Sequence, residues 1–160
     1  MANESVYIET SLVSYLVARP SCDLIRTAHQ QVTVNWWDNE RGKFDLFVSD
    51  VVIEEASAGD QSESAKRLAV LNGIPLLQIT TEAVLLAEAL VKKHALPEKA
   101  AQDAPHIAIA CVNGIDYLLT WNCKHIANAH MRGKIETTCR RAGFEPPVIC
   151  TPEEMVGSDD

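Results

Sequence analysis

Short runs of apolar and β-branched residues alternate along the chain with longer segments in which apolar residues recur at roughly helical spacing. The short runs predict five strands, over residues 5–9, 44–49, 75–80, 116–121 and 147–151. Strands that alternate with helices are typical of βαβ units, whose strands form a parallel sheet. The pattern therefore predicts an α/β fold built on one mostly parallel, five-stranded sheet.

The segments between these strands predict helices over residues 23–40, 65–72, 81–94 and 105–112. Residues 81–94 have the clearest single apolar face, and Thr81 can cap the start of this helix. Asp60 and Glu63 have the spacing of a capping box ahead of residues 65–72. The amphipathic pattern thus supplies the helices that a parallel sheet needs to cover its faces.

The composition is that of one globular domain, since 47% of the 160 residues are hydrophobic and 22% are charged. We expect this domain to span residues 1–156, with an acidic tail over residues 157–160. No run approaches the roughly 20 apolar residues that cross a bilayer, and the N-terminus lacks the basic and apolar stretches of a signal peptide. These features predict a cytoplasmic protein without a membrane span.

Several enzyme classes are disfavoured by motifs that the sequence lacks. The five cysteines are scattered and include no C-x-x-C pair, which argues against a disulfide framework and against structural zinc. The nucleotide-binding motifs G-x-x-x-x-G-K-[ST] and G-x-G-x-x-G do not occur, and the zinc-hydrolase motif H-E-x-x-H is absent. A haloacid-dehalogenase-like phosphatase needs a nucleophilic Asp after the first strand and a second acid two residues later, whereas Glu9 is followed by Thr10 and Ser11.

The formal net charge of −8 opposes binding of nucleic acid over the molecule as a whole. Residues 122–144 are an exception, because Glu136 is the one acidic residue among five basic ones. The five are Lys124, Arg132, Lys134, Arg140 and Arg141. This segment predicts a local surface for nucleic acid, although a solvated helix face explains each basic residue equally well.

Open parallel sheets bind ligands in the crevice at the carboxyl ends of their strands, so the polar residues that follow each strand are informative. Glu9 ends the first predicted strand and precedes Thr10 and Ser11, with a helix expected to begin near Leu12. Glu9 either complements the start of that helix or belongs to a binding site, and the sequence leaves both interpretations open.

Glu55 follows the second strand and shares the apolar face of its segment, four residues after Val51 and three after Val52. Glu54 falls on the more polar face and is expected in solvent. A carboxylate on a buried face requires a partner, because an unpaired charge is costly there. Glu55 is therefore the stronger candidate, with a half-exposed glutamate at a helix end as the alternative.

Asp103 precedes Pro105 and an apolar helix, so it is either a helix cap or a site residue. If the helix begins earlier, Asp103 and His106 share a face, and His106 is most simply a buried histidine with satisfied hydrogen bonds. Asp116 begins the fourth strand and is expected at the opposite edge of the sheet, so it is discounted.

The fourth predicted strand brings Thr120 and Asn122 to the same carboxyl edge, and Lys124 and His125 follow directly. Three carboxylates and an asparagine near strand ends suggest oxygen ligands for a hard divalent ion, Mg²⁺ or Mn²⁺. Such an ion activates water and neutralises charge on a phosphate, which is the logic of metal-assisted phosphodiester hydrolysis.

Four segments contain these candidates: residues 6–11 (VYIETS), 52–59 (VIEEASAG), 103–108 (DAPHIA) and 117–125 (YLLTWNCKH). In order and spacing, the chain resembles the PIN-domain ribonucleases over nearly its whole length, and among them the VapC-type toxins of type II toxin–antitoxin pairs. The resemblance implies a PIN-like three-layer α/β/α sandwich and Mg²⁺- or Mn²⁺-dependent cleavage of single-stranded RNA. It also implies a homodimer and inhibition by a cognate antitoxin protein.

By this resemblance, the metal is held by Glu9, Glu55 and Asp103, and these three act in catalysis together with Asn122. Water or phosphate is oriented by Thr10 and Thr120, and RNA phosphates are bound by Lys124, His125 and residues 132–141. Hydrolysis then leaves 5′-phosphate and 3′-hydroxyl ends. Trp36 and Trp37 either stack on RNA bases or, as is commoner on a long amphipathic helix, pack in the core or a dimer contact.

The chain departs from the family pattern at two positions. The family usually has Asp where this chain has Glu9, and often has another Asp where it has Asn122. Glutamate keeps the charge on a longer arm, whereas Asn122 keeps an oxygen ligand but loses a charge. The departures motivate an alternative function, a catalytically degenerate PIN-like module that binds RNA or protein without turnover.

Overall fold

A computed structural model of the protein describes residues 2–93 and 95–156. Its sheet has five strands: β1 (Glu4–Ile8), β2 (Phe44–Ser49), β3 (Leu76–Leu77), β4 (Tyr117–Leu119) and β5 (Val148–Cys150). The strand order is β3-β2-β1-β4-β5, and every neighbouring pair is parallel. The predicted α/β fold with a five-stranded sheet is therefore confirmed, and the sheet is parallel throughout.

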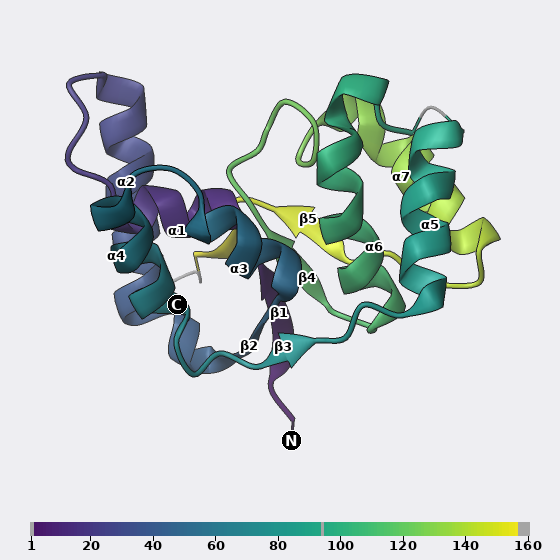
Figure 1. Ribbon diagram of the computed structural model, residues 1–160, viewed down its shortest axis with the longest axis horizontal. Coiled ribbons are helices and arrows are strands. Elements are labelled where there is room, and N and C mark those ends of the chain that lie inside the picture. Colours follow the sequence, from purple (N-terminus) through teal and green to yellow (C-terminus); the bar gives the residue numbers. More distant parts are fainter. Residues whose placement is uncertain (1, 94, 157–160) are drawn as a thin grey trace.

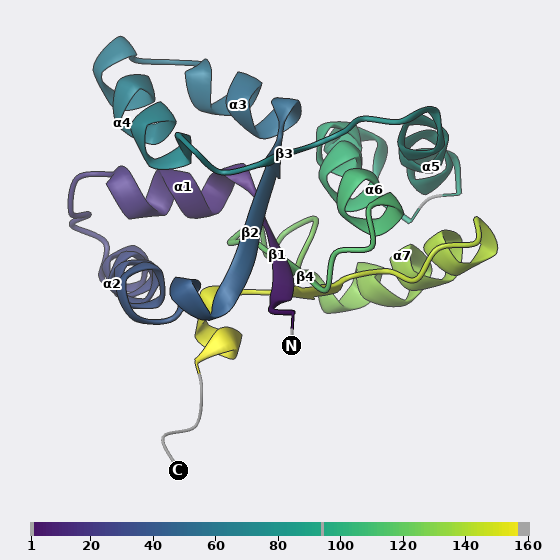
Figure 2. The same ribbon diagram turned by 90° about the horizontal axis from the view of Figure 1, so that it is seen from below.

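The helices in chain order are α1 (Thr10–Val17), α2 (Leu24–Asn39), α3 (Asp50–Ser57), α4 (Gln61–Leu71), α5 (Thr81–Lys92), α6 (Ala104–Val112) and α7 (Ala129–Arg141). Short 3-10 helices span Arg41–Lys43 (η1), Glu98–Asp103 (η2) and Pro152–Met155 (η3). Helices α1 to α4 cover one face of the sheet and α5 to α7 cover the other (Figure 2). This arrangement confirms the three-layer α/β/α sandwich.

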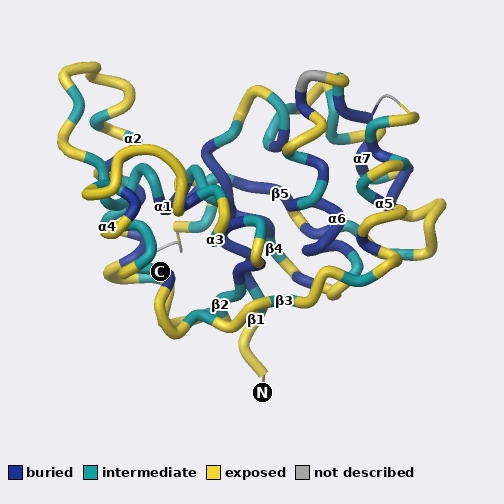
Figure 3. The backbone as a smooth tube through the Cα atoms, viewed as in Figure 1, coloured by how far each residue is buried: buried dark blue, intermediate teal, exposed yellow. Residues whose placement is uncertain are grey.

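The central strand β1 lies between two neighbours and under both helical layers, and for this reason its last three residues are buried in succession, without alternation. Val6, Tyr7 and Ile8 are completely buried. Helix α6 is also buried over most of its surface, from Ala104 to Cys111. Burial is concentrated in these central elements, whereas α2 and α4 expose their outer faces (Figure 3). The site described below is therefore built on rigid, buried elements.

Several helices begin, or are capped, at earlier residues than predicted. The hydroxyl of Thr80, not that of Thr81, accepts the hydrogen bond at the start of α5. Helix α4 starts at Gln61, since the Asp60 carboxylate accepts a hydrogen bond from the backbone of Glu63. Helix α1 likewise starts at Thr10 rather than near Leu12. The expected acidic tail, residues 157–160, lies outside the described residues.

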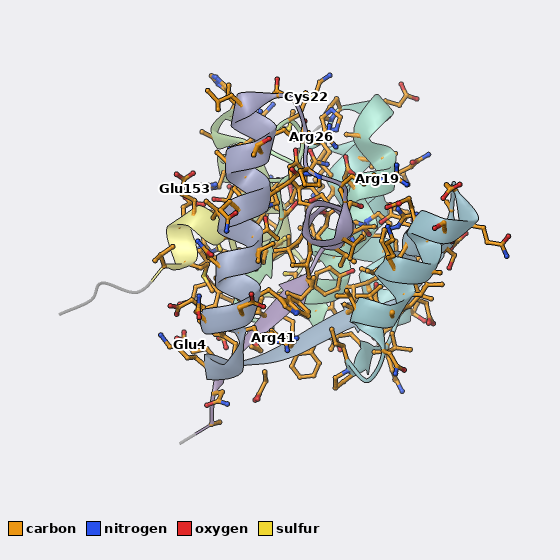
Figure 4. All side chains as sticks on the ribbon, turned by 90° about the vertical axis from the view of Figure 1, so that its left-hand side faces the viewer. Glu4, Arg19, Cys22, Arg26, Arg41 and Glu153 are labelled. Atoms are coloured by element: carbon orange, nitrogen blue, oxygen red, sulfur yellow. The ribbon has the colours of Figure 1, made fainter. Side chains whose placement is uncertain are left out.

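The two tryptophans of α2 belong to the core, so the base-stacking interpretation is wrong for both. Trp36 is 1% exposed and stacks on Phe44 with ring centroids 6.1 Å apart. Arg41 lies just past the end of α2 (Figure 4). Its guanidinium lies over the ring of Trp37, 4.4 Å from the ring centroid. Among the described helices, none is both long enough and apolar enough to cross a membrane.

Candidate metal site at the sheet edge

The order of the strands creates a topological switch point between β1 and β4. The chain passes from β1 to β2 and β3 on one side, and then returns to place β4 and β5 on the other side (Figure 1). Open α/β sheets bind ligands at such a reversal, outside the carboxyl ends of the strands. Glu9 directly follows β1 and Thr120 directly follows β4, and the Thr120 hydroxyl donates a hydrogen bond of 2.8 Å to Glu9 Oε2.

Glu9 both caps α1 and lies at this switch point. Its side chain caps α1, because Oε2 accepts hydrogen bonds from the backbone N–H of Ser11 at 3.0 Å and from the Ser11 hydroxyl. The residue is 5% exposed. All the donors that reach Glu9 from the described residues bind Oε2, so that Oε1 remains available.

Glu55 reaches the same place from the other side, on α3 after β2. Its Oε1 accepts hydrogen bonds from the Thr10 hydroxyl and from His106 Nε2, each at 2.6 Å. Burial acts to raise the pKa of Glu55, but the hydrogen bonds from His106 and Thr10 and the charge of His106 outweigh it and lower the pKa. Glu55 is therefore an anchored carboxylate, while Glu54 is exposed as predicted.

His106 lies at the centre of the site and is completely buried. Its Nε2 faces Glu55, and its Nδ1 lies 2.8 Å from the hydroxyl of Tyr7. Burial acts to lower the pKa of His106, but the hydrogen bond to Glu55 and the charges of Glu9, Glu55 and Asp103 raise it above its ordinary value. The prediction of a histidine with satisfied hydrogen bonds is confirmed.

The structure groups the predicted carboxylates unevenly. Ligand atoms of Glu9, Glu55 and His106 all lie within 4.8 Å of one another. Asp103 is not in this group; its Oδ2 pairs with His125 Nδ1 at 3.0 Å instead. Asp103 stands at the N-cap position of α6 but makes no cap hydrogen bond, so the cap interpretation is wrong. Its charge is nevertheless one of the causes that raise the pKa of His106.

The segment after β4 forms a tight turn. The side-chain oxygen of Asn122 accepts a hydrogen bond of 3.0 Å from the backbone of His125, and the backbone N–H of Asn122 donates to the Thr120 hydroxyl at 2.9 Å. Asn122 thus shapes the turn, and Lys124 on the turn is exposed. Asp116 lies at the opposite edge, where it accepts from the backbone of Ser5 at 2.8 Å, as predicted.

The hydroxyls of Thr10 and Thr120 bind the two glutamates, and their predicted role toward water or phosphate stays a prediction. Thr10 donates to Glu55 and Thr120 donates to Glu9, so both hydroxyls hold carboxylates in place. The sequence reasoning missed Tyr7 altogether. A tyrosine within a completely buried strand requires a partner for its hydroxyl, which is the signal that would have revealed it.

The residues present fit a hard divalent ion. Glu9 Oε1 and Glu55 Oε2 receive no hydrogen bond from the described part of the chain, and no Lys or Arg of that part pairs with either carboxylate. Carboxylate oxygens are the donors that Mg²⁺ and Mn²⁺ prefer. Two anchored carboxylates with free oxygens, at a topological switch point, thus form a pair that could hold such an ion.

Comparison of the chain with models of known protein families gives no match, and comparison with curated proteins gives none. A function for this site therefore has to be argued from its geometry.

Proposed function

We propose that the protein is a Mg²⁺- or Mn²⁺-dependent endoribonuclease of the PIN type, which hydrolyses phosphodiester bonds in single-stranded RNA. The observation that carries the proposal is the pairing of Glu9 and Glu55 at the switch point, each with one oxygen anchored by protein donors and one oxygen free. Glu9 directly follows β1 and Glu55 lies on α3, the helix after β2, which agrees with the order of motifs that resembles PIN-domain ribonucleases.

Glu9 and Glu55 would hold the ion, and Asp103 would complete the set when its pairing with His125 is exchanged for the ion or a bound water. The ion supplies a water of lowered pKa and neutralises charge on the phosphate. Thr10 and Thr120 keep the two glutamates oriented during the reaction. Asn122 holds the turn that presents Lys124 and His125 toward RNA.

The biological setting is proposed from the resemblance. A VapC-type role makes the protein the toxin of a toxin–antitoxin pair, active in the cytoplasm as a homodimer and inhibited by its cognate antitoxin. The net negative charge of the chain repels RNA, but a dimer could place its two basic segments along one RNA-binding groove.

A second candidate is a PIN-like module that binds RNA or protein without cleaving it. One observation favours it: Glu55 and Asp103 are each already paired with a histidine within the chain, at 2.6 and 3.0 Å. A site whose charges are compensated internally has less need of a cation.

The deciding experiment is cleavage of a mixed cellular RNA pool by the purified protein with Mg²⁺ or Mn²⁺, beside the same reaction with EDTA. Glu55→Gln removes a proposed ligand charge, and Asp103→Asn removes another. We expect each to reduce cleavage by about 100-fold or more, equivalent to at least ~2.7 kcal/mol of transition-state stabilisation. Glu54→Gln is the matched control, since Glu54 is the exposed neighbour on the same helix and should cleave normally.

Mass spectrometry of the sample first establishes that no antitoxin has copurified with the chain. Metal-dependent cuts that the ligand variants lose support the nuclease, and end mapping should find 5′-phosphates. If the native protein binds Mn²⁺ and RNA yet leaves the RNA intact, the binding module is the better proposal.

A further inference from the structure

We propose that Tyr7 and His106 are positioning residues of the metal site: a buried chain of hydrogen bonds from Ser49 through Tyr7 and His106 determines which oxygen of Glu55 faces the ion. The inference rests on the proposed function and deepens it, because it explains how a long side chain is held ready for metal.

The hydrogen-bonded chain crosses the interior of the molecule. Ser49 Oγ lies 2.8 Å from the Tyr7 hydroxyl, which lies 2.8 Å from His106 Nδ1, and His106 Nε2 lies 2.6 Å from Glu55 Oε1. Ser49, Tyr7 and His106 are all completely buried. Their elements are the end of β2, the middle of β1 and the first turn of α6, so the path joins the sheet to one helical layer and ends at α3 in the other.

The direction of the last hydrogen bond follows from the chemistry of its acceptor. An ionised carboxylate can only accept, so the proton between His106 and Glu55 belongs to Nε2. A phenol carries its proton at neutral pH, so the Tyr7 hydroxyl can both donate and accept. If Nδ1 accepts a hydrogen bond from the Tyr7 hydroxyl, Ser49 donates to that hydroxyl; if Nδ1 donates to it, the hydroxyl donates to Ser49. In both arrangements, Nε2–H points at Glu55.

The consequence for Glu55 is a fixed orientation. Thr10 on α1 and His106 on α6 both donate to Oε1, one from each helical layer. The side chain is 35% exposed, and without His106 it would be held by the Thr10 hydroxyl alone. Glutamate loses considerable rotamer freedom when it is ordered. Ordering it in advance leaves Oε2 directed to the ion and strengthens binding.

The test is the affinity for Mn²⁺, measured by isothermal titration calorimetry, together with RNA cleavage at varied Mn²⁺. Tyr7→Phe keeps the ring and removes the hydroxyl that fixes His106. We expect its dissociation constant for Mn²⁺ to rise about tenfold, as for other groups that orient metal ligands. At saturating Mn²⁺, kcat should return to nearly the native value and KM for RNA should not change, whereas a merely structural role leaves the affinity of folded molecules untouched.

Tyr117→Phe is the matched control, because it removes a tyrosine hydroxyl from the adjacent strand β4, where it donates to Glu4 at 3.0 Å. It should leave Mn²⁺ affinity unchanged. His106→Gln can place an N–H near the position of Nε2, and His106→Leu cannot. We therefore expect His106→Gln to bind Mn²⁺ more tightly than His106→Leu, and thermal midpoints show which variants fold.

Each of three results would overturn the positioning role. If the native protein binds Mn²⁺ and cleaves RNA while Tyr7→Phe and a folded His106 variant keep native affinity, the positioning role is overturned and the nuclease stands. If the native protein neither binds Mn²⁺ nor cleaves RNA, the proposed function fails and the inference fails with it. A ¹⁵N spectrum of the native protein that finds His106 protonated on Nδ1 alone also overturns the positioning role.

Discussion

Trp121 shows how a single residue ties the site to the rest of the fold. It follows Thr120, and its indole stacks on His29 with ring centroids 4.2 Å apart. Its Nε1 donates a buried hydrogen bond of 2.7 Å to the hydroxyl of Thr33 on α2. The backbone of Trp121 also donates to the Ser11 hydroxyl at 2.9 Å. Through its backbone and its side chain, this one residue thus fastens the turn after β4 to both α1 and α2.

Thr33→Val should lower the free energy of unfolding by about 1–3 kcal/mol, because the Trp121 N–H loses its buried partner. Thr137→Val is the matched control: both threonines donate to the carbonyl four residues earlier, at 2.7 and 2.8 Å, but Thr137 is exposed. Urea unfolding of the two variants measures the difference. Equal losses would show that the Trp121 contact contributes nothing.

For single residues, the sequence predicts that Glu9 and Glu55 approach the same edge of the sheet, but it does not predict which residues pair with them. Glu9 and Glu55 stand out because a charge at a strand end or on an apolar face needs an explanation. The partners of Asp103 and His106 depend on contacts between residues far apart in sequence, such as Tyr7 with His106 and Asp103 with His125. No local pattern encodes such pairs, since the strand order brings them together.

The ends of the elements depend on particular backbone conformations. Gly114, between α6 and β4, has a φ of 69°, in the left-handed region that favours glycine. Gly133 lies within α7 and has no positive φ. An added Cβ meets nothing within 4 Å at either position. Substitution at these two glycines therefore tests backbone conformation without steric contact.

Gly114→Ala should lower the free energy of unfolding by about 1–2 kcal/mol, the cost of a left-handed conformation for an L residue. Gly133→Ala should raise it by about 0.5–1 kcal/mol, because alanine loses less entropy in a helix. Urea titration of both proteins gives the two changes. A shift of the same sign in both would contradict this assignment.

Strand β3 illustrates the limit of prediction for elements. The sequence predicts a strand over residues 75–80, yet only Leu76–Leu77 pair with β2. Pro75 has no N–H, and it contributes only its carbonyl, which accepts from Val48 at 3.0 Å. The other strands are predicted to within two residues at either end, because buried parallel strands are recognisable apolar runs.

Over the whole molecule, the charge distribution indicates which surface would serve the proposed binding of RNA. Lys93, Lys134 and Arg141 line a hollow between α5 and α7. Arg141 forms no ion pair with any described residue, whereas the guanidinium of Arg140 lies 3.0 Å from Glu145 and 3.7 Å from Glu136. The two neighbouring arginines therefore differ in how much of their charge is available to a phosphate.

In a Glu55→Gln background, which prevents cleavage, Arg141→Ala should weaken binding of a single-stranded RNA. It should also reduce the slope of log affinity against log salt by about 0.7, the loss of one phosphate contact. Arg140→Ala should change both quantities much less, because its charge is already paired. Fluorescence anisotropy between low and moderate salt measures both slopes. If both variants keep the slope of the Glu55→Gln parent, Arg141 does not contact an RNA phosphate.

The brevity of the outermost strands has a consequence for how copies of this chain can associate. β3 contributes two residues and β5 three, so each open side of the sheet presents few unsatisfied backbone groups. A second copy cannot extend the sheet across such margins into a continuous ladder. Short edge strands therefore disfavour strand-by-strand polymerisation, to which sheets with long open edges are prone, and the proposed dimer is expected to use helical surfaces instead.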